Sequence, residues 1–277
     1  LGRFPINHSV TYIFTPNDLF APFSASAINK VYKPGVDALR MVVSTGMLSA
    51  VELDAVMGHG TDDEPSWGRT ALMVRLNVIK WNFEWALMGG KVAERWIVGG
   101  SLQGELGPIG VRAEGHAGFP DRDGDGGLDG DRDIHGRVAG GINILIPWHN
   151  FSINLEYAFM SDGADDTFDY MGRAMRFFPD DQPYLANHYV GLGVSGEIIP
   201  ILTFNTFGLF NAQDYSGLAS VMLDLSVADE ASFSAGMLVP WGEEPTADSG
   251  PPHHARELRS EVGLMPVTVF LETRFYY

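Results

Sequence analysis

The segment with the clearest chemistry is DRDGDGGLDGDRD, residues 121–133, which holds six aspartates and four glycines. Four of its carboxylates follow the spacing D-x-D-x-D-G-x-x-D: Asp121, Asp123, Asp125 and Asp129. Alternate residues place carboxylates on one side of a tight loop, and Gly126 permits the turn that wraps a hard cation with oxygen ligands. We therefore expect a structural Ca²⁺ site here. The alternative is a solvated acidic loop kept open by charge repulsion.

The composition limits which partners and sites the chain can have. Its 35 acidic and 18 basic residues give a formal charge of −17, which disfavours nucleic acid or an anionic membrane surface as the main partner. The chain has no cysteine, so disulfides and thiolate metal sites are excluded, whereas a metal site made of oxygen ligands stays open. The sequence contains no run of about 18 apolar residues, so it predicts no transmembrane helix.

The elements that must position this loop are predicted to be β-strands, because apolar and polar residues alternate with a period of two. In FSINLEYAF, residues 151–159, every second side chain is apolar, and the alternation recurs along the chain. These segments approach ten residues, whereas strands of soluble sandwiches average about 5 to 6 residues. Long alternating strands with charged residues on the polar face favour a membrane β-barrel with a wet interior.

The joints between these strands alternate between short and long. We expect short joints near 46–48, 79–81, 106–108, 147–149, 198–200 and 227–230, and longer ones near 15–36, 58–68, 90–95, 119–135, 160–186, 212–216 and 240–265. The prediction is an all-β, transmembrane, antiparallel up-and-down β-barrel of about 14 strands (12–18 are compatible), with short periplasmic turns and long extracellular loops. Residues 1–277 would form a single barrel domain, and we expect further strands upstream of Leu1.

The C-terminal LETRFYY resembles the final strand of bacterial outer-membrane β-barrel proteins, which the barrel-assembly machinery reads. The opening LGRFPINHSVTYIFTPNDLFAPF is similar to a segment of porin-like and alginate-export-like barrels. These resemblances imply a location in the outer membrane of a Gram-negative bacterium, in contact with lipid and lipopolysaccharide. The aspartate segment resembles thrombospondin type 3-like calcium loops, which implies that Asp131 or Asp133 completes the ligand shell. It departs from the EF-hand pattern, because Arg132 stands where that loop carries Glu.

If the apolar faces meet lipid, the opposite faces carry charged residues that line the lumen. They are Arg40, Glu52, Asp54, Arg75, Glu84, Arg112, Glu114, Arg137, Glu156, Asp224, Glu272 and Arg274. Opposite charges fall at facing positions of neighbouring strands in three places: Arg40 with Glu52 and Asp54, Arg75 with Glu84, and Arg137 with Glu156. These side chains either form a rigid paired ladder or line a solute path that the acidic excess makes weakly cation-preferring, and both can hold at once.

The sequence carries no G-x-S-x-G and no H-E-x-x-H motif, so we expect a channel and not an enzyme. The predicted function is a porin-like channel for passive passage of small hydrophilic solutes. The alternatives are a plugged barrel that anchors a surface or periplasmic assembly, an outer-membrane hydrolase, and a soluble calcium-binding sandwich. Self-association and a surface protein partner stay open, as does the inward folding of the opening loop and of the long loop at 160–186.

Overall fold

The computed structural model describes residues 1–20, 33–59, 64–121, 134–175, 184–245 and 258–275. Within these ranges fourteen strands form one antiparallel sheet whose order follows the sequence. The strands are β1 (Gly2–Phe4), β2 (Val36–Gly46), β3 (Ser49–Val56), β4 (Ala71–Lys80), β5 (Phe83–Val92), β6 (Arg95–Leu106), β7 (Ile109–Pro120), β8 (His135–Ile146), β9 (Phe151–Met160), β10 (His188–Ile199), β11 (Leu202–Asn211), β12 (Gly217–Ala228), β13 (Ala231–Trp241) and β14 (Thr268–Phe275). The predicted all-β class, the up-and-down order and the strand number are confirmed.

Helices are short in the described part of the chain. They are the 3₁₀ turns η2 (Trp148–Asn150) and η3 (Thr167–Asp169) and the α-helix α1 (Tyr170–Ala174). None of the helices in the described ranges is long and apolar enough to cross a membrane.

The turns fall where the alternation placed them. Each predicted short joint lies between two consecutive strands, from β2–β3 to β12–β13, and the predicted long joints lie at the opposite ends of these strands. The first long joint is longer than predicted, because β1 ends at Phe4 and the connection to β2 begins at residue 5 instead of 15. In the β4–β5 turn, Lys80 pairs with Phe83, and both intervening residues have positive φ, 56° for Trp81 and 62° for Asn82. Two left-handed residues match the right-handed twist of the flanking strands, which makes this two-residue hairpin tight.

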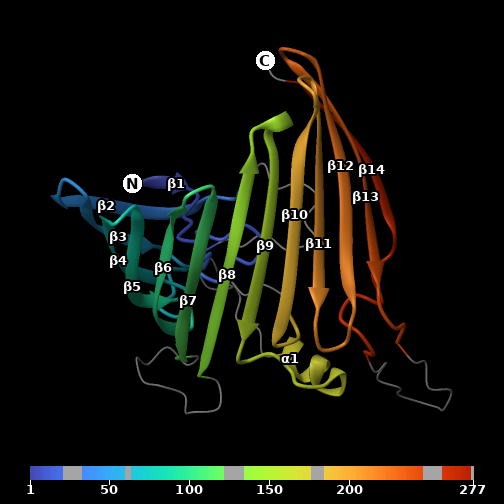
Figure 1. Cartoon of the computed structure of the whole chain (residues 1–277). Helices are drawn as coiled ribbons and strands as arrows, with labels where there is room; N and C mark the ends of the chain where they lie inside the picture. The colour runs from blue at the N-terminus through green and yellow to red at the C-terminus, as the bar shows by residue number, and fades with distance from the viewer. Residues whose placement is uncertain (21–32, 60–63, 122–133, 176–183, 246–257, 276–277) are drawn as a thin grey trace, which may run out of the picture. The chain divides into compact units, whose positions relative to one another are not determined.

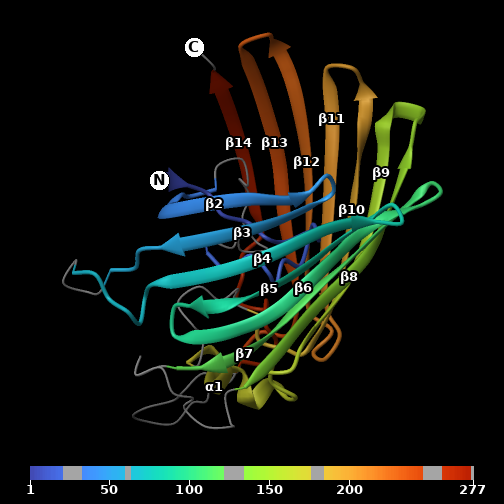
Figure 2. The ribbon, with the colours of Figure 1, turned by 90° about the vertical axis from the view of Figure 1, so that its left-hand side faces the viewer.

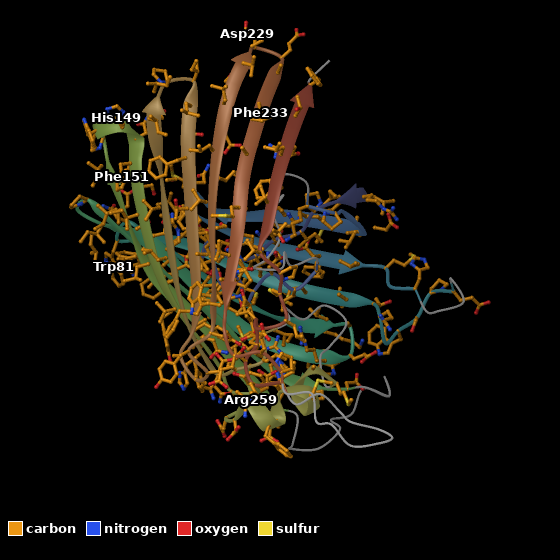
Figure 3. The ribbon with its side chains drawn as sticks, turned by 90° about the vertical axis from the view of Figure 1, so that its right-hand side faces the viewer. Trp81, His149, Phe151, Asp229, Phe233 and Arg259 are labelled. Carbon is orange, nitrogen blue, oxygen red and sulfur yellow. The ribbon has the colours of Figure 1, made fainter. Side chains whose placement is uncertain are left out.

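The chain divides into two compact units, of which the first contains β1–β7 and the second β10–β14, while β8 and β9 are shared. In the first unit β2, β3, β4, β5, β6 and β7 run side by side (Figure 2). In the second, β10, β11, β12 and β13 do the same (Figure 1). Figure 3 shows His149 and Asp229 at the end of the second unit where the short turns lie, and Arg259 at the opposite end.

The apolar face of the strands is the exposed one. β4 exposes four alternating apolar side chains by 42–47%, whereas Ala71 and Met73, on the opposite face, are buried. The exposed residues are Leu72, Val74, Leu76 and Val78. β14 exposes Val269, Leu271 and Phe275 by about 70%, whereas Glu272 and Arg274 are half-buried. A soluble protein would hide such a continuous apolar surface, so this face suits a hydrocarbon solvent.

An apolar cluster lies on the other face of the first unit, at the strand ends near the long connections. The N-terminal segment, which we define as residues 5–20, contributes Ile6 and Leu19 to this cluster. The strands contribute Ala38, Val56, Ala71, Met73, Met88, Val92 and Ile97. Ile6 is 1% and Leu19 2% exposed. Burial of side chains of this size contributes about 1.5–3 kcal/mol each, which fixes the N-terminal segment against the strands.

Replacing Ile6 with valine is expected to destabilise the first unit by about 0.5–1.5 kcal/mol, because one buried methylene is lost and a small cavity is left. Denaturant unfolding of the protein in detergent micelles measures the change. Ile79→Val is the matched control, since Ile79 is 47% exposed beside the β4–β5 turn, and it should stay within about 0.5 kcal/mol of the native protein. Equal effects of the two substitutions would contradict the burial of the N-terminal segment.

Candidate functional site: the charged inner face

All twelve charged residues that the sequence assigned to the inner faces are buried or half-buried, in strands whose alternate apolar residues are exposed. Eight lie in the first unit: Arg40, Glu52, Asp54, Arg75, Glu84, Arg112, Glu114 and Arg137. Glu156, Asp224, Glu272 and Arg274 lie in the second. Charges on this face are shielded from the exposed apolar side, so they act on one another, on neighbouring polar groups, on the N-terminal segment or on a solute that reaches this face.

Ion pairs tie these charges together. Arg40 Nε lies 2.7 Å from Asp54 Oδ1 and 2.7 Å from Glu52 Oε1, while Nη2 donates to Asp54 Oδ2 at 3.0 Å. Arg75 lies 3.6 Å from Glu84. These are two of the three expected pairings. Register explains the first, because Arg40 pairs with Asp54 between β2 and β3. Arg75 instead faces Met88, and Glu84 lies four positions away from Met88 along β5, so the long arginine side chain makes this second contact along the strands.

Contacts with polar groups also hold Arg137, Asp224 and Arg274 on this face. Arg137 donates to Asp162 at 2.6 Å. In the second unit, Asn205 and Ser234 donate to Asp224 at 3.2 and 2.5 Å. Arg274 donates from both Nε and Nη2 to Glu272, two residues earlier on the same strand. Pairing at this density favours a rigid wall.

The N-terminal segment lies on this face, an arrangement that the sequence had left open. Glu114 of β7 accepts hydrogen bonds from the backbone N–H groups of Val10, Thr11 and Asn17, the last two at 3.3 and 3.2 Å. Asn17 also donates from its amide to the Gly100 carbonyl at 3.0 Å. Glu114 is 5% exposed. Its carboxylate therefore anchors a segment about a hundred residues earlier in the chain.

A polar cleft of about 510 Å³ lies between the N-terminal segment and the strands of the first unit. Residues 7–12 form one side, and the strands supply Arg75, Glu84, Gln103 and Arg112. Gln103 donates to Glu84 at 2.8 Å, and the Arg112 guanidinium lies 4.0 Å from the centre of the Tyr12 ring. With both signs of charge and little apolar surface, the cleft can hold a hydrated small solute.

A second polar cluster lies in the second unit where the long connections begin. This long-loop cluster consists of Tyr170, Tyr189, Asn211, Asp214 and Glu261. Tyr189 donates to Glu261 Oε2 at 2.6 Å and Asn211 donates to it at 2.8 Å, while the Leu185 N–H reaches Oε1 at 3.1 Å. Tyr170 donates to Asp214 at 3.1 Å, and Asp214 also accepts from the Glu261 N–H at 2.7 Å.

Burial governs the protonation of this cluster. It raises the pKa of the Glu261 carboxyl from 4.5 to about 7. The nearby Asp214 carboxylate also raises this pKa, whereas the hydrogen bonds that Glu261 accepts lower it. Burial and Asp214 likewise raise the pKa of the Tyr170 hydroxyl above its usual value. Nothing in the sequence around Glu261 marks it, because its partners lie between 47 and 76 residues away.

Most of the expected calcium loop lies outside the described residues, which is the case for Asp123, Asp125, Asp129, Asp131 and Asp133. Asp121 is described. It is buried at the end of β7, and its N–H donates to the Glu94 carbonyl at 2.8 Å. The loop is thus fixed at its first residue to the β5–β6 connection.

No family model matches the sequence, and no curated protein matches it. The structure is similar to OccK3 (OpdO) of Pseudomonas aeruginosa, with a TM-score of 0.52 and 8% identity over 74% of this chain and 65% of that one. It also matches OccK8 (OprE) of the same organism, with a TM-score of 0.49 and 11% identity over 75% and 67%. The chain thus spans slightly less than two thirds of the length of OccK3. At this identity the likeness concerns the fold alone: the chain has an antiparallel, up-and-down β-barrel fold like that of OccK3.

Proposed function

We propose that the protein is a porin-like channel in the bacterial outer membrane that passes small hydrophilic solutes passively. The observation that carries this proposal is the pair of opposed strand faces, one continuously apolar and exposed, the other charged, paired and shielded. In a membrane, the first face meets lipid and the second bounds a wet interior. The similarity to the fold of OccK3 supports the same function, as does the polar cleft beside the N-terminal segment.

The same proposal gives the protein its partners. Lipid and lipopolysaccharide would contact the exposed apolar face, and β14 would be the strand read by the barrel-assembly machinery. Its alternation of Val269, Leu271 and Phe275 with Glu272 and Arg274 supports that role. The terminal tyrosines lie outside the described residues.

A weak preference for cations is part of the proposal. The twelve inner-face residues comprise seven acids and five arginines, and the formal charge of the whole chain is −17. A cation entering such a path gains more from the wall charges than an anion does, and salt screens the difference beyond about 10 Å at 0.1 M.

Single-channel recording in planar bilayers tests the channel directly. The detergent-purified chain should give steady current steps. Under a salt gradient across the bilayer, the sign of the reversal potential should show that cations pass more readily than anions. Silence from protein shown by circular dichroism to be folded would overturn the proposal and favour a plugged barrel that serves as an anchor. Current steps whose reversal potential shows a preference for anions would support the channel but contradict its cation preference.

The aspartate segment is proposed to bind Ca²⁺ as a structural staple on an external loop. Its spacing of carboxylates and glycine supports this, and so does the anchoring of Asp121 to the Glu94 carbonyl. Millimolar Ca²⁺ is expected to protect residues 121–133 from limited proteolysis, and Asp123→Asn with Asp125→Asn should abolish the protection. A matched control is Asp165→Asn with Asp166→Asn in another long connection. Protection that survives loss of Asp123 and Asp125, or that Mg²⁺ gives equally, would contradict the site.

A further inference from the structure

His8, Glu52 and Asp54 bring one imidazole and two carboxylates together inside the first unit. His8 Nε2 lies 3.0 Å from Asp54 Oδ2, and one potential ligand atom from each of the three residues lies within 4.8 Å of the others. All three side chains are buried, with residue exposures of 2%, 9% and 1%. Nitrogen and oxygen donors gathered at this spacing in a buried place are what a metal ion requires.

The fold explains why these groups meet. Glu52 and Asp54 are two residues apart on β3, so both carboxylates project from the inner face. His8 comes from the N-terminal segment, which Ile6 and Leu19 fix to the apolar cluster. The Phe20 ring packs edge-on against the imidazole, with ring centres 5.9 Å apart. The imidazole is therefore held over β3 by the packing of Ile6, which precedes His8 in the chain, and of Leu19 and Phe20, which follow it.

Two buried atoms of this group lie at ion-pair distance from a neighbour but without the geometry of a hydrogen bond. Among the described residues, neither His8 Nε2 nor Glu52 Oε1 makes a hydrogen bond of good geometry, although Asp54 Oδ2 and Arg40 Nε lie 3.0 and 2.7 Å away. Buried polar atoms are nearly always hydrogen-bonded, and exceptions point to a bound species. Arg40 offsets one of the two carboxylate charges, which leaves a net negative charge facing the imidazole.

We propose that His8, Glu52 and Asp54 form a site for a divalent transition metal of the Zn²⁺ type, which fastens the N-terminal segment to β3. An imidazole with two carboxylates suits Zn²⁺ and its neighbours, whereas Ca²⁺ and Mg²⁺ prefer oxygen ligands alone. Zinc bonds of about 2.0–2.2 Å require the three ligand atoms to close up by roughly an ångström. His8 lies on irregular backbone, which can make that movement.

Zinc binding to the detergent-purified full chain is the test, and it needs no channel activity. A competition titration with a chromophoric chelator gives the stoichiometry and the affinity, and the visible absorption of Co²⁺ reports the geometry of the same site. His8→Ala and Glu52→Gln are each expected to weaken one Zn²⁺ site at least about tenfold. His149→Ala is the matched control, because His149 is exposed in the β8–β9 turn, and it should leave this affinity unchanged. Excess Mg²⁺ or Ca²⁺ should not displace the zinc.

Zinc affinity and stoichiometry that match the native protein in both His8→Ala and Glu52→Gln would overturn the proposal, and so would the absence of Zn²⁺ binding. Zinc held elsewhere in the chain is separated by the stoichiometry, since only the proposed site is lost in the two variants. Circular dichroism and heat-dependent mobility on gels check that each variant folds. If His8→Ala does not fold, the nearly isosteric Glu52→Gln carries the test.

Discussion

Replacing Glu114 with alanine is expected to release the N-terminal segment and to enlarge the single-channel conductance. The carboxylate accepts hydrogen bonds from the N–H groups of Val10, Thr11 and Asn17 in a nearly dry environment. Hydrogen bonds to a charged group contribute about 1.5–3 kcal/mol each, and a buried donor that loses its partner is costly. A loss of about 3 kcal/mol changes the ratio of released to bound segment by about a hundredfold.

The release has two measurable consequences. Limited proteolysis should cut within residues 5–20 of Glu114→Ala and spare the native protein, and the mean current step should grow because the segment no longer occupies the inner face. The protease cleavage and the current step of Glu114→Gln should lie between those of the native protein and of Glu114→Ala, since the single carbonyl oxygen of glutamine keeps part of the acceptor capacity.

Asp224→Asn provides the matched control for Glu114→Ala. It removes a carboxylate from the inner face of the second unit, where Asn205 and Ser234 donate to it. Its protease resistance within residues 5–20 should match that of the native protein, and its mean current step should not grow. If Glu114→Ala behaves like Asp224→Asn, then Asn17 and the apolar cluster hold the segment without Glu114.

The strands were predictable because each one separates two different environments. A residue in β4 or β14 faces either an apolar exterior or a charged interior, so the type of its side chain indicates which face it lies on. The length of the alternating run then indicates the length of the strand. Turn residues interrupt that period, which is why the joints near 79–81 and 198–200 coincide with the ends of β4 and β10. The pairing of Arg40 with Asp54 follows from the same register.

The position of the N-terminal segment could not be obtained in this way. Residues 5–20 have no regular period, and their hydrogen bonds to Glu114 and Gly100 join residues 83 to 104 positions apart in the chain. A buried glutamate on a strand, such as Glu114, looks in sequence like any other charge of the inner face. The distinction lies in its three backbone donors, which only the tertiary structure brings to it.

Raising the pH through neutrality is expected to loosen the long-loop cluster. In the folded protein the Glu261 carboxyl has a pKa of about 7, against 4.5 when it is free. Below about pH 4.5 both the closed and the open cluster are protonated, and the stabilising contribution is complete. Between 4.5 and 7 opening releases a proton, so the free energy of opening falls by about 1.4 kcal/mol per pH unit. Above about pH 7 it is constant, after a total loss of up to about 3 kcal/mol.

Hydrogen exchange of the amides of Leu185, Ser216 and Glu261 measures this opening, because each N–H donates to Glu261 or Asp214 within the cluster. After correction for the intrinsic exchange rate, protection should decrease from pH 5 to 7 and then level off. In Glu261→Gln, which mimics the protonated acid, the decrease should vanish. Glu243→Gln is the control, since Glu243 is exposed and pairs only loosely with Arg259 at 3.4 Å; it should retain the full pH dependence. Protection that is flat between pH 5 and 7 in the native protein would show that Glu261 ionises near its ordinary pKa, with water reaching the cluster.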